Sequence, residues 1–408
     1  MLTLAQSQPA TTLPSGLLAG MCLDAADGNR TGQSVTQRFG HSGRIRTRNH
    51  AYTYDTASNR LLSVSGHGAL QYSYLSNGDL SSETGSGIGK SFLYDARNRF
   101  SSFINQGMSA VTTGYATNAL GERVQKSSGD DDDGTDYIYD EQGHLIAEGH
   151  DGNVSREYIY LGSLPVAELD HGQIYYIHTN HLGAPQKMTD ARQRIVWDRI
   201  AEPFGQTFAL KGDRDLMNLR FPGQYHDAES GLDYNFYRSY DSGTGRYSQF
   251  DPIGLLGGIN GYGYALQNPI RYTDPYGLWT VNIGVSGSIN IPLYGQIGIG
   301  GGGSIGIVFD GSTFATYKVI GGGVGAGSGG SLGIQIGASN ANSVCDLKGP
   351  FGSLNVSGGE GLILGGEGYV GSGSNGQTVY GWNIFIGGGG GSPASGTLGG
   401  TYTWIKPF

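Results

Sequence analysis

The fold is decided by a motif that recurs along the chain, first as "AYTYDTASNRLLSV" (51–64), "QYSYLSNGDLSSE" (71–83) and "SFLYDARNRFSSF" (91–103). Each copy is typical of an aromatic strand, a polar turn with Asp, Asn or Gly, and a second short strand. Tyr54, Tyr74 and Tyr94 recur at intervals of 20 residues, which is the spacing of a repeat array. Two later stretches continue the motif, "DYIYDEQGHLIAEG" (136–149) and "REYIYLGSLPVAEL" (156–169). Because one hairpin cannot bury its apolar face alone, we expect the copies to form one continuous β-sheet.

The composition favours a protein rich in strands and turns, long enough for more than one domain. The 408 residues include 74 Gly and 26 Tyr, whereas charged residues make up 14%, below the quarter that is usual in soluble domains. A net charge of -9 gives no basic surface for phosphates, so we expect no nucleic acid partner. Cys22 and Cys345 are too few and too far apart for a disulfide framework.

The beginning of the chain does not have the pattern of a signal peptide. "MLTLAQSQPATTLPSGLLAG" (1–20) lacks both a basic segment and an unbroken apolar segment. No stretch has the roughly 18 consecutive apolar residues of a membrane-spanning helix. Export therefore requires another route, and insertion into a membrane through strands stays open.

Two longer stretches carry a family resemblance, "YYIHTNHLGAPQKMTDARQRIVWDRIAEPFGQ" (175–206) and "LRFPGQYHDAESGLDYNFYRSYDSGTGRYSQFDPIGL" (219–255). They resemble the core that closes the YD-repeat arrays of Rhs proteins, which are related to teneurins and to the C subunits of insecticidal toxin complexes. The resemblance implies a β-sheet shell wound from the repeats. This chain has too few copies to close such a shell, so we expect a truncated or displaced cassette, or a fragment that completes another chain's shell.

The resemblance and the composition together predict four segments. Residues 1–50 are unassigned and contain degraded repeats, 51–170 hold the YD repeats, and 171–278 form the Rhs-associated core. Residues 279–408 form a glycine-rich C-terminal domain of the effector type. The predicted fold class is mainly β, a partial repeat shell with its core, followed by a glycine-rich β-meander or barrel.

Two matching pentapeptides end the core, "DPIGL" from Asp251 and "DPYGL" from Asp274. An isolated Asp-Pro-x-Gly sequence is most often a turn, because the Asp side chain bonds backbone amides and Pro sets φ. In the family that the core resembles, the two carboxylates form a self-cleaving aspartyl protease that cuts just after the second Gly-Leu. Two carboxyls held close together cannot both ionise, so one can act as an acid and the other as a base.

The resemblance extends this candidate site to two further elements. Arg238 matches a family position that assists cleavage, where a fixed cation can stabilise developing negative charge. The alternative is a structural ion pair with a neighbour such as Asp241. The expected cleavage site is the bond between Leu278 and Trp279, and the expected reaction occurs once, within the chain.

Other candidate sites are weaker. His178 and His181 have a spacing near that of metal ligands, but no further ligands are evident, so hydrogen-bonded structural roles are favoured. The acidic run from Gly129 to Asp140 does not fit a calcium loop, because with Gly134 as the loop glycine the first ligand position falls on Gly129. We therefore predict no metal and no cofactor.

The last segment changes character at Trp279. It contains no His and no Arg, and "TVNIGVSGSINI" (280–291) places apolar residues on one face and small residues on the other. This favours either a barrel with a filled interior or strands whose apolar face meets lipid. Candidates for interfacial aromatic residues are Trp279, Tyr369, Tyr380, Trp382, Tyr402 and Trp404. A soluble binding module or an inert remnant is the competing interpretation, and no catalytic site is evident, although Cys345 and Asp346 adjoin one another.

The leading functional prediction is a self-cleaving Rhs-family toxin of bacterial competition that releases or carries a membrane-active domain. The family implies a cognate immunity protein as partner, together with other shell chains or a secretion-system spike. It also implies specialised secretion such as type VI, or a cytoplasmic location if the chain is a displaced cassette. The rival hypothesis is a structural or cell-surface module that binds carbohydrate or protein and releases no toxin.

Overall fold

The computed structural model describes residues 16–24, 28–39, 44–66, 68–85, 87–107, 111–129, 134–211, 217–252, 254, 260–278, 280–294, 297–309, 314–341, 344–359, 361–373, 378–391 and 394–407. Two compact units are present. The first comprises Met1–Asp251 with Gly258–Gly277, and the second comprises Pro252–Gly257 with Leu278–Phe408. Both consist mainly of antiparallel strands, so the predicted fold class is confirmed. No helix in the described part of the chain has the length and apolar character needed to cross a bilayer.

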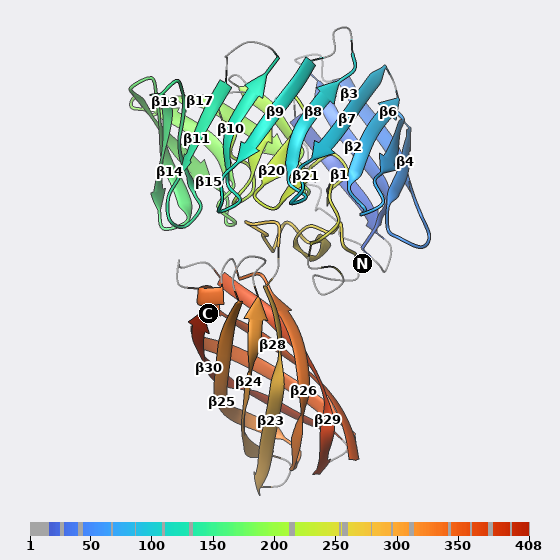
Figure 1. Ribbon diagram of the computed structural model, residues 1–408, viewed down its shortest axis with the longest axis vertical. Coiled ribbons are helices and arrows are strands. Elements are labelled where there is room, and N and C mark those ends of the chain that lie inside the picture. Colours follow the sequence, from blue (N-terminus) through green and yellow to red (C-terminus); the bar gives the residue numbers. More distant parts are fainter. Residues whose placement is uncertain are drawn as a thin grey trace. The chain divides into compact units, whose positions relative to one another are not determined.

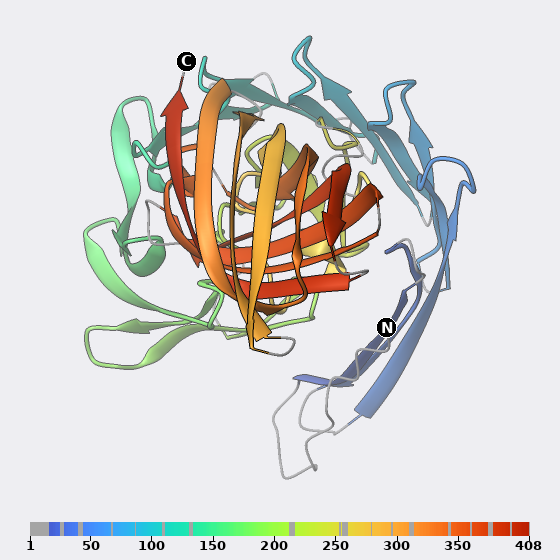
Figure 2. The ribbon, with the colours of Figure 1, turned by 90° about the horizontal axis from the view of Figure 1, so that it is seen from below.

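The repeats of the first unit form one long antiparallel sheet, in which each strand pairs with the next along the chain (Figure 1). Seen from below in Figure 2, the sheet curves in an open arc. Among the described residues its strands are β1 (Gly16–Asp24), β2 (Arg30–Phe39), β3 (Arg44–Tyr54), β4 (Leu61–Gly66), β5 (Leu70–Tyr74), β6 (Leu80–Gly85), β7 (Ile88–Tyr94), β8 (Phe100–Asn105), β9 (Val111–Thr117), β10 (Arg123–Ser128), β11 (Gly134–Tyr139), β12 (Leu145–His150), β13 (Asn153–Leu161), β14 (Leu164–Asp170), β15 (Gln173–Thr179), β16 (Pro185–Asp190), β17 (Ile195–Ala201) and β18 (Thr207–Lys211).

The turn that joins the two strands of a repeat explains why the motif contains Asp. The Asp95 carboxylate accepts hydrogen bonds from the backbone N–H groups of Arg97 and Arg99, both at 2.8 Å. Asn98, three residues after the Asp, has a φ of 64°, in the left-handed region that Asn tolerates. The same bonds recur at Asp140 and Asp190. The repeated Asp is therefore a turn former that satisfies backbone amides.

Strands β15 to β18 of the predicted core continue the sheet of the repeats, and its later part, from β19 to η3 and here called the core segment, packs against one face of this sheet. Its strands are β19 (Tyr225–Asp227), β20 (Leu232–Asn235), β21 (Arg238–Asp241) and β22 (Arg246–Tyr247), followed by the 3-10 helix η3 (Ala265–Gln267). Leu232 joins a buried cluster with the aromatic residues of the early repeats, among them Tyr52, Tyr72 and Phe92. Tyr225 joins a second buried cluster with residues of the later repeats, among them Tyr158. Apolar burial of this kind is the main force that holds sheet and core together.

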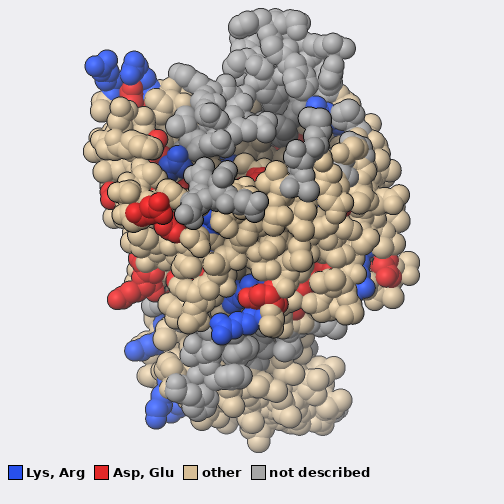
Figure 3. Space-filling model, turned by 45° about the horizontal axis from the view of Figure 1, so that its top comes forward, with Lys and Arg blue, Asp and Glu red and all other residues tan. Residues whose placement is uncertain are grey.

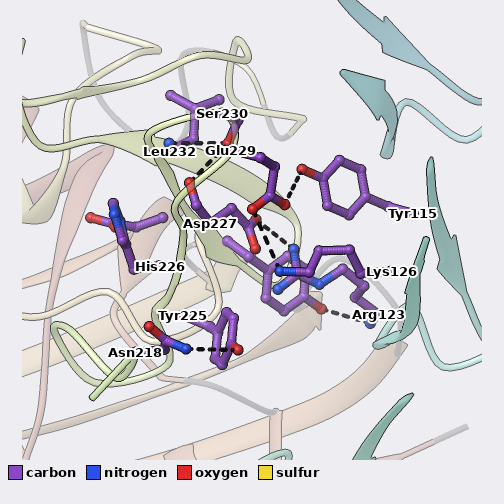
Figure 4. Close-up of polar contacts among 12 residues, drawn as sticks. Tyr115, Arg123, Lys126, Asn218, Tyr225, His226, Asp227, Glu229, Ser230 and Leu232 are labelled. Atoms are coloured by element: carbon purple, nitrogen blue, oxygen red, sulfur yellow. Dashed lines mark hydrogen bonds and ion pairs between the residues drawn. The ribbon is translucent and has the colours of Figure 1, made fainter. Parts of the chain in front are cut away.

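A buried ion pair fixes the position of the core on the sheet (Figure 4). Arg123, in β10, contacts Asp227, in β19, with 2.5 Å between Nη1 and Oδ2, and both side chains are 2% exposed. Its guanidinium lies near the rings of Tyr115, Tyr137, Tyr225 and Tyr234. A buried charge is tolerated only when it is paired, so either residue without the other would be strongly destabilising.

The second unit is a closed barrel of eight strands among the described residues: β23 (Thr280–Tyr294), β24 (Ile297–Phe309), β25 (Phe314–Ala326), β26 (Gly329–Ser339), β27 (Gly349–Gly358), β28 (Gly361–Ser372), β29 (Thr378–Gly391) and β30 (Ala394–Pro407). The 3-10 helix η4 (Val344–Leu347) lies between β26 and β27. Around the barrel the order is β23-β24-β25-β30-β27-β28-β29-β26. The first four strands, β23 to β26, and the last four, β27 to β30, each have the spatial order 4-1-2-3. This order is a Greek key rather than a simple meander.

The barrel carries its apolar side chains on the outside. The exposed large apolar residues of its strands include Ile283, Val285, Ile289, Ile291, Ile299, Ile305, Ile307, Ile320, Val324, Leu332, Ile334, Ile336, Leu354, Val356, Leu362, Leu364, Val370, Ile384, Ile386 and Leu398. The residues that line the interior are mostly Ser, Thr, Asn and Gly. A soluble barrel has the opposite arrangement. The predicted alternation is thus present, with its apolar face turned outward.

The predicted interfacial aromatic residues divide between the two faces of the barrel. Tyr402 and Trp404 are 41% and 45% exposed and lie on the outside. Tyr369 lines the interior and packs against the buried cluster there, because every second residue of β28 faces inward and Tyr369 is one of them. Its assignment to an interfacial belt was therefore wrong. Tyr380 and Trp382 are half-buried, and Trp279 lies outside the described residues.

Charged side chains are sparse on the surface. On the face seen in Figure 3, acidic and basic side chains lie among each other and are separated by uncharged residues. Several carboxylates are instead buried under the sheet, including Glu148 and Glu168. Of these two groups, Glu168 links the stability of the first unit to pH.

We expect the first unit to lose stability as pH rises from about 5 to 8. Burial raises the pKa of Glu168 from 4.5 to about 8 against the opposing charge of Arg156, so the folded chain binds a proton that the unfolded chain releases in this window. The contribution of this group to the free energy of unfolding is fully present below pH 4.5. Above pH 4.5 it falls by up to about 1.4 kcal/mol per pH unit. Urea unfolding at several pH values measures the slope.

Glu168→Gln should flatten this slope, whereas Glu157→Gln, a change at an exposed position of the neighbouring strand β13, should leave it unchanged. Equal slopes in both variants would show that Glu168 does not take up the proton.

Candidate autoproteolytic site

The structure brings together the three predicted catalytic residues within the core of the first unit. Arg238 begins β21, Asp251 follows β22, and Asp274 lies in the segment after η3. Their exposed fractions are 2%, 5% and 1%, so all three side chains are buried. The Asp251 backbone N–H donates to the Gly261 carbonyl at 2.8 Å, which fixes the start of the first pentapeptide.

The Arg238 guanidinium is the centre of the site. Its Nη2 atom lies 3.0 Å from Oδ2 of Asp251 and 3.4 Å from Oδ2 of Asp274. Its Nε donates to the carbonyl of Gly277 at 2.5 Å, and its Nη1 donates to the carbonyl of Gly261 at 3.1 Å. One side chain thus joins both carboxylates and the end of the second pentapeptide. The alternative partner, Asp241, instead accepts bonds from Gly243 and Thr244.

Asp274 is oriented by two residues that sequence reasoning missed. The Tyr247 hydroxyl donates to Oδ2 of Asp274 at 2.8 Å, and Nδ2 of Asn235 donates to the Asp274 backbone carbonyl at 2.8 Å and to the Tyr247 hydroxyl at 2.6 Å. The Arg238 guanidinium lies 3.7 Å from the centre of the Tyr247 ring, which adds a cation–π contact. Burial, and next the charge of Asp274, raise the pKa of Tyr247 far above its usual value, so it remains a donor.

Two glycines allow the backbone to approach the site this closely. Gly277 has a φ of 66°, and a Cβ there would lie 2.7 Å from the carbonyl oxygen of Asn235. Gly223 has a φ of 79°, and a Cβ there would lie 1.9 Å from the carbonyl oxygen of Pro275. Because neither backbone can move away without displacing the second pentapeptide, both positions require Gly.

The arrangement supplies the groups that acid–base hydrolysis requires. Two buried carboxyl groups share one cation, which can balance one negative charge between them. The donors on Asp274 hold one of the two carboxylates in a single orientation. Leu278 is buried and follows Gly277 directly, whereas Trp279, the other residue of the expected cleavage site, lies outside the described residues.

The weaker candidates behave as structural residues. His178 Nε2 lies 3.0 Å from the Thr189 hydroxyl, and His181 Nε2 lies 2.9 Å from the carbonyl oxygen of Ile270. No group of three or more His, Cys, Asp or Glu that could hold a metal ion occurs in the described part of the chain. The central acidic residues of the run from Gly129 to Asp140 lie outside that part.

One stretch of the chain matches a known protein family. The family model described as RHS protein matches residues 174–209. The chain is 42% identical over 113 residues to Toxin protein Tse5 of Pseudomonas aeruginosa, a match that covers 28% of this chain and 8% of Tse5. The chain is an Rhs-repeat protein.

A second relative of this Rhs protein is Double-stranded DNA deaminase toxin A of Burkholderia cenocepacia, 31% identical over 250 residues, which are 51% of this chain and 17% of the relative. The chain therefore spans less than a fifth of either relative. Among solved structures, the Tc holotoxin pore of Photorhabdus luminescens is similar over 63% of this chain and 18% of its own, with 14% identity and a TM-score of 0.30.

The Tyr247–Asp274 bond of the core segment should contribute measurably to stability. Tyr247→Phe keeps the ring under Arg238 but removes the donor to a buried carboxylate, and such bonds contribute about 1.5–3 kcal/mol. The matched control is Tyr240→Phe, which removes a buried hydroxyl that donates to the neutral carbonyl of Phe204 at 2.8 Å. Urea unfolding should show the larger loss for Tyr247→Phe, and equal losses would contradict the charge-assisted bond.

Proposed function

We propose that this Rhs protein is a self-cleaving toxin of bacterial competition, in which Asp251 and Asp274 hydrolyse the bond between Leu278 and Trp279. The observation that carries the proposal is the buried Arg238 guanidinium, which contacts both carboxylates and the carbonyl of Gly277. A turn needs its Asp only for local backbone bonds, and a cation shared between two distant turns is not required for that purpose.

The proposed reaction is a hydrolysis. One carboxylate takes a proton from a water molecule, whose oxygen attacks the carbonyl carbon of Leu278. The partner carboxyl, protonated, gives its proton to the nitrogen of Trp279 as the C–N bond breaks. Arg238 holds the preceding carbonyl of Gly277 in place, and Tyr247 and Asn235 hold Asp274, so these three act as positioning residues.

We further propose that the barrel of residues 279–408 acts on a membrane. Its strands have 10–15 residues, and a membrane-crossing strand needs about 9–11. Its exposed side chains are large and apolar along every strand, such as Ile289, Leu332 and Leu398 at 62%, 66% and 68%. A closed barrel satisfies all backbone groups within lipid, so this surface is suited to a bilayer.

The remaining partners follow from the toxin proposal. A bacterium that makes such a chain needs a cognate immunity protein, and delivery calls for a specialised secretion route such as type VI with a spike or further shell chains. If the chain neither cuts itself nor binds lipid, the rival function applies, a structural or cell-surface module that binds carbohydrate or protein.

We expect the purified full-length chain to separate into two fragments on a denaturing gel, the smaller one beginning at Trp279. Asp274→Asn should leave the chain whole, because an amide can neither take up nor give the proton that the reaction needs. The control Asp136→Asn, in β11 of the repeats, should cut as fully as the unchanged chain. N-terminal sequencing identifies the cut, and equal cleavage in both variants would exclude the dyad.

We expect the full-length chain to float with liposomes of phosphatidylethanolamine and phosphatidylglycerol in a density gradient. Ile334→Arg places a cation at the middle of an outward-facing strand, which costs about 2–4 kcal/mol in lipid and should reduce the floated fraction at least tenfold. The control is Leu161→Arg, at an exposed position of the repeats, which should float normally. Equal flotation of the two variants would show that the barrel surface does not enter lipid.

A further inference from the structure

The barrel interior contains a polar cavity. A barrel of eight strands is wide enough either for side chains to fill it or to hold one small ligand. Here glycines and serines face inward and leave a cavity of about 140 Å³, room for several water molecules. Its polar lining includes Ser286, Ser304, Ser353, Asn355, Asn383 and Thr401. The glycine content of the sequence thus creates space inside the barrel.

Inward-facing glycines are also required by the close approach of the strands. A Cβ at Gly399 would lie 2.2 Å from the carbonyl oxygen of Gly322, and one at Gly302 would lie 2.6 Å from the carbonyl oxygen of Gly287. No side chain fits at these positions, so the close approach of the strands itself requires the glycines that leave the cavity open.

A single carboxylate, that of Glu367, faces the described part of this cavity. Asn383 donates to its Oε2 at 2.8 Å. Asn355 and Ser353 lie on the neighbouring strand β27 and line the same cavity. The three described lysines of this unit, Lys318, Lys348 and Lys406, are exposed. The lumen therefore has a negative centre surrounded by neutral oxygen and amide groups, the lining that hard cations prefer.

Glu367 lies where the polar cavity meets an apolar end. A second cavity, of about 40 Å³, is lined by Glu367 and by Leu347 and Phe351. Beyond it a buried cluster of Val344 and Leu347 of η4 with Val308 and Phe351 closes that end of the barrel. The opposite end is lined by hydroxyl and amide groups such as Ser288 and Asn290. A polar route thus leads to the carboxylate and stops at an apolar wall.

We propose that the barrel interior is a cation-selective path with Glu367 as its binding position, closed in this structure by the apolar cluster around η4. The inference rests on the proposed membrane insertion and adds the class of solute that the barrel passes. Cations gain from the charge of Glu367 and from the neutral oxygen atoms that can replace part of their hydration shell. Anions meet this carboxylate, and none of the described lysines of the unit lines either cavity to offset its charge.

The test is a planar bilayer of phosphatidylethanolamine and phosphatidylglycerol with the full-length chain under a potassium chloride gradient. The reversal potential should report preference for potassium over chloride, and Glu367→Gln should reduce the permeability ratio roughly fivefold, the effect of one unit charge at contact. Glu367→Asp should keep the preference, because it keeps the charge. The matched control Glu141→Gln, in an exposed repeat turn, should leave the ratio unchanged.

A second variant tests the closed end. Leu347→Ser removes an apolar contact of the end cluster and leaves Glu367 unchanged. It should raise the time-averaged conductance without changing the permeability ratio. Liposome flotation of every variant separates the two proposals. Failure of the unchanged chain to float would overturn membrane insertion, whereas flotation without conductance, or the same permeability ratio in Glu367→Gln as in the unchanged chain, would overturn the cation path alone.

Discussion

The burial of one guanidinium is the constraint on which the rest of the core depends. Arg238 is 2% exposed, and a cation in such a place must be surrounded by acceptors. Asp251, Asp274 and the carbonyls of Gly261 and Gly277 supply them. These groups come from both pentapeptides and from Gly261 between them, so Asp251, Asp274 and Gly277 must all lie close to the start of β21. The Asp residue of each pentapeptide thus takes part in the pairing with Arg238.

The sequence allowed much of this to be predicted, because its signals were local or recurrent. The 20-residue interval of Tyr54, Tyr74 and Tyr94 predicted paired strands, and the turn chemistry of Asp95 and Asp140 needs only residues close in sequence. The partners of Asp274 could not be predicted in the same way. Tyr247 and Asn235 are 27 and 39 residues away, and nothing in their local sequence distinguishes them from other core residues.

The barrel shows the same division between local and long-range information. The alternation from Ile283 to Ile291 predicted one apolar face, but period 2 does not determine whether that face turns inward or outward. The Greek-key order arises from pairings such as β25 with β30, whose residues are about 80 positions apart. The parity error at Tyr369 has the same cause, since the local glycine-rich sequence around it gives little indication of which face it occupies.

The central claim is that the two carboxylates joined by Arg238 hydrolyse the chain after Leu278. The most direct measurement is to unfold the purified Asp251→Asn chain and the unchanged chain made in an uncut, denatured form, and to refold both in water enriched in oxygen-18. The account predicts that the unchanged chain yields a fragment ending at Leu278 whose terminal carboxylate has gained one oxygen-18 atom, and that the variant yields none. Cleavage at another bond, or a fragment from the variant with the same label, would contradict it.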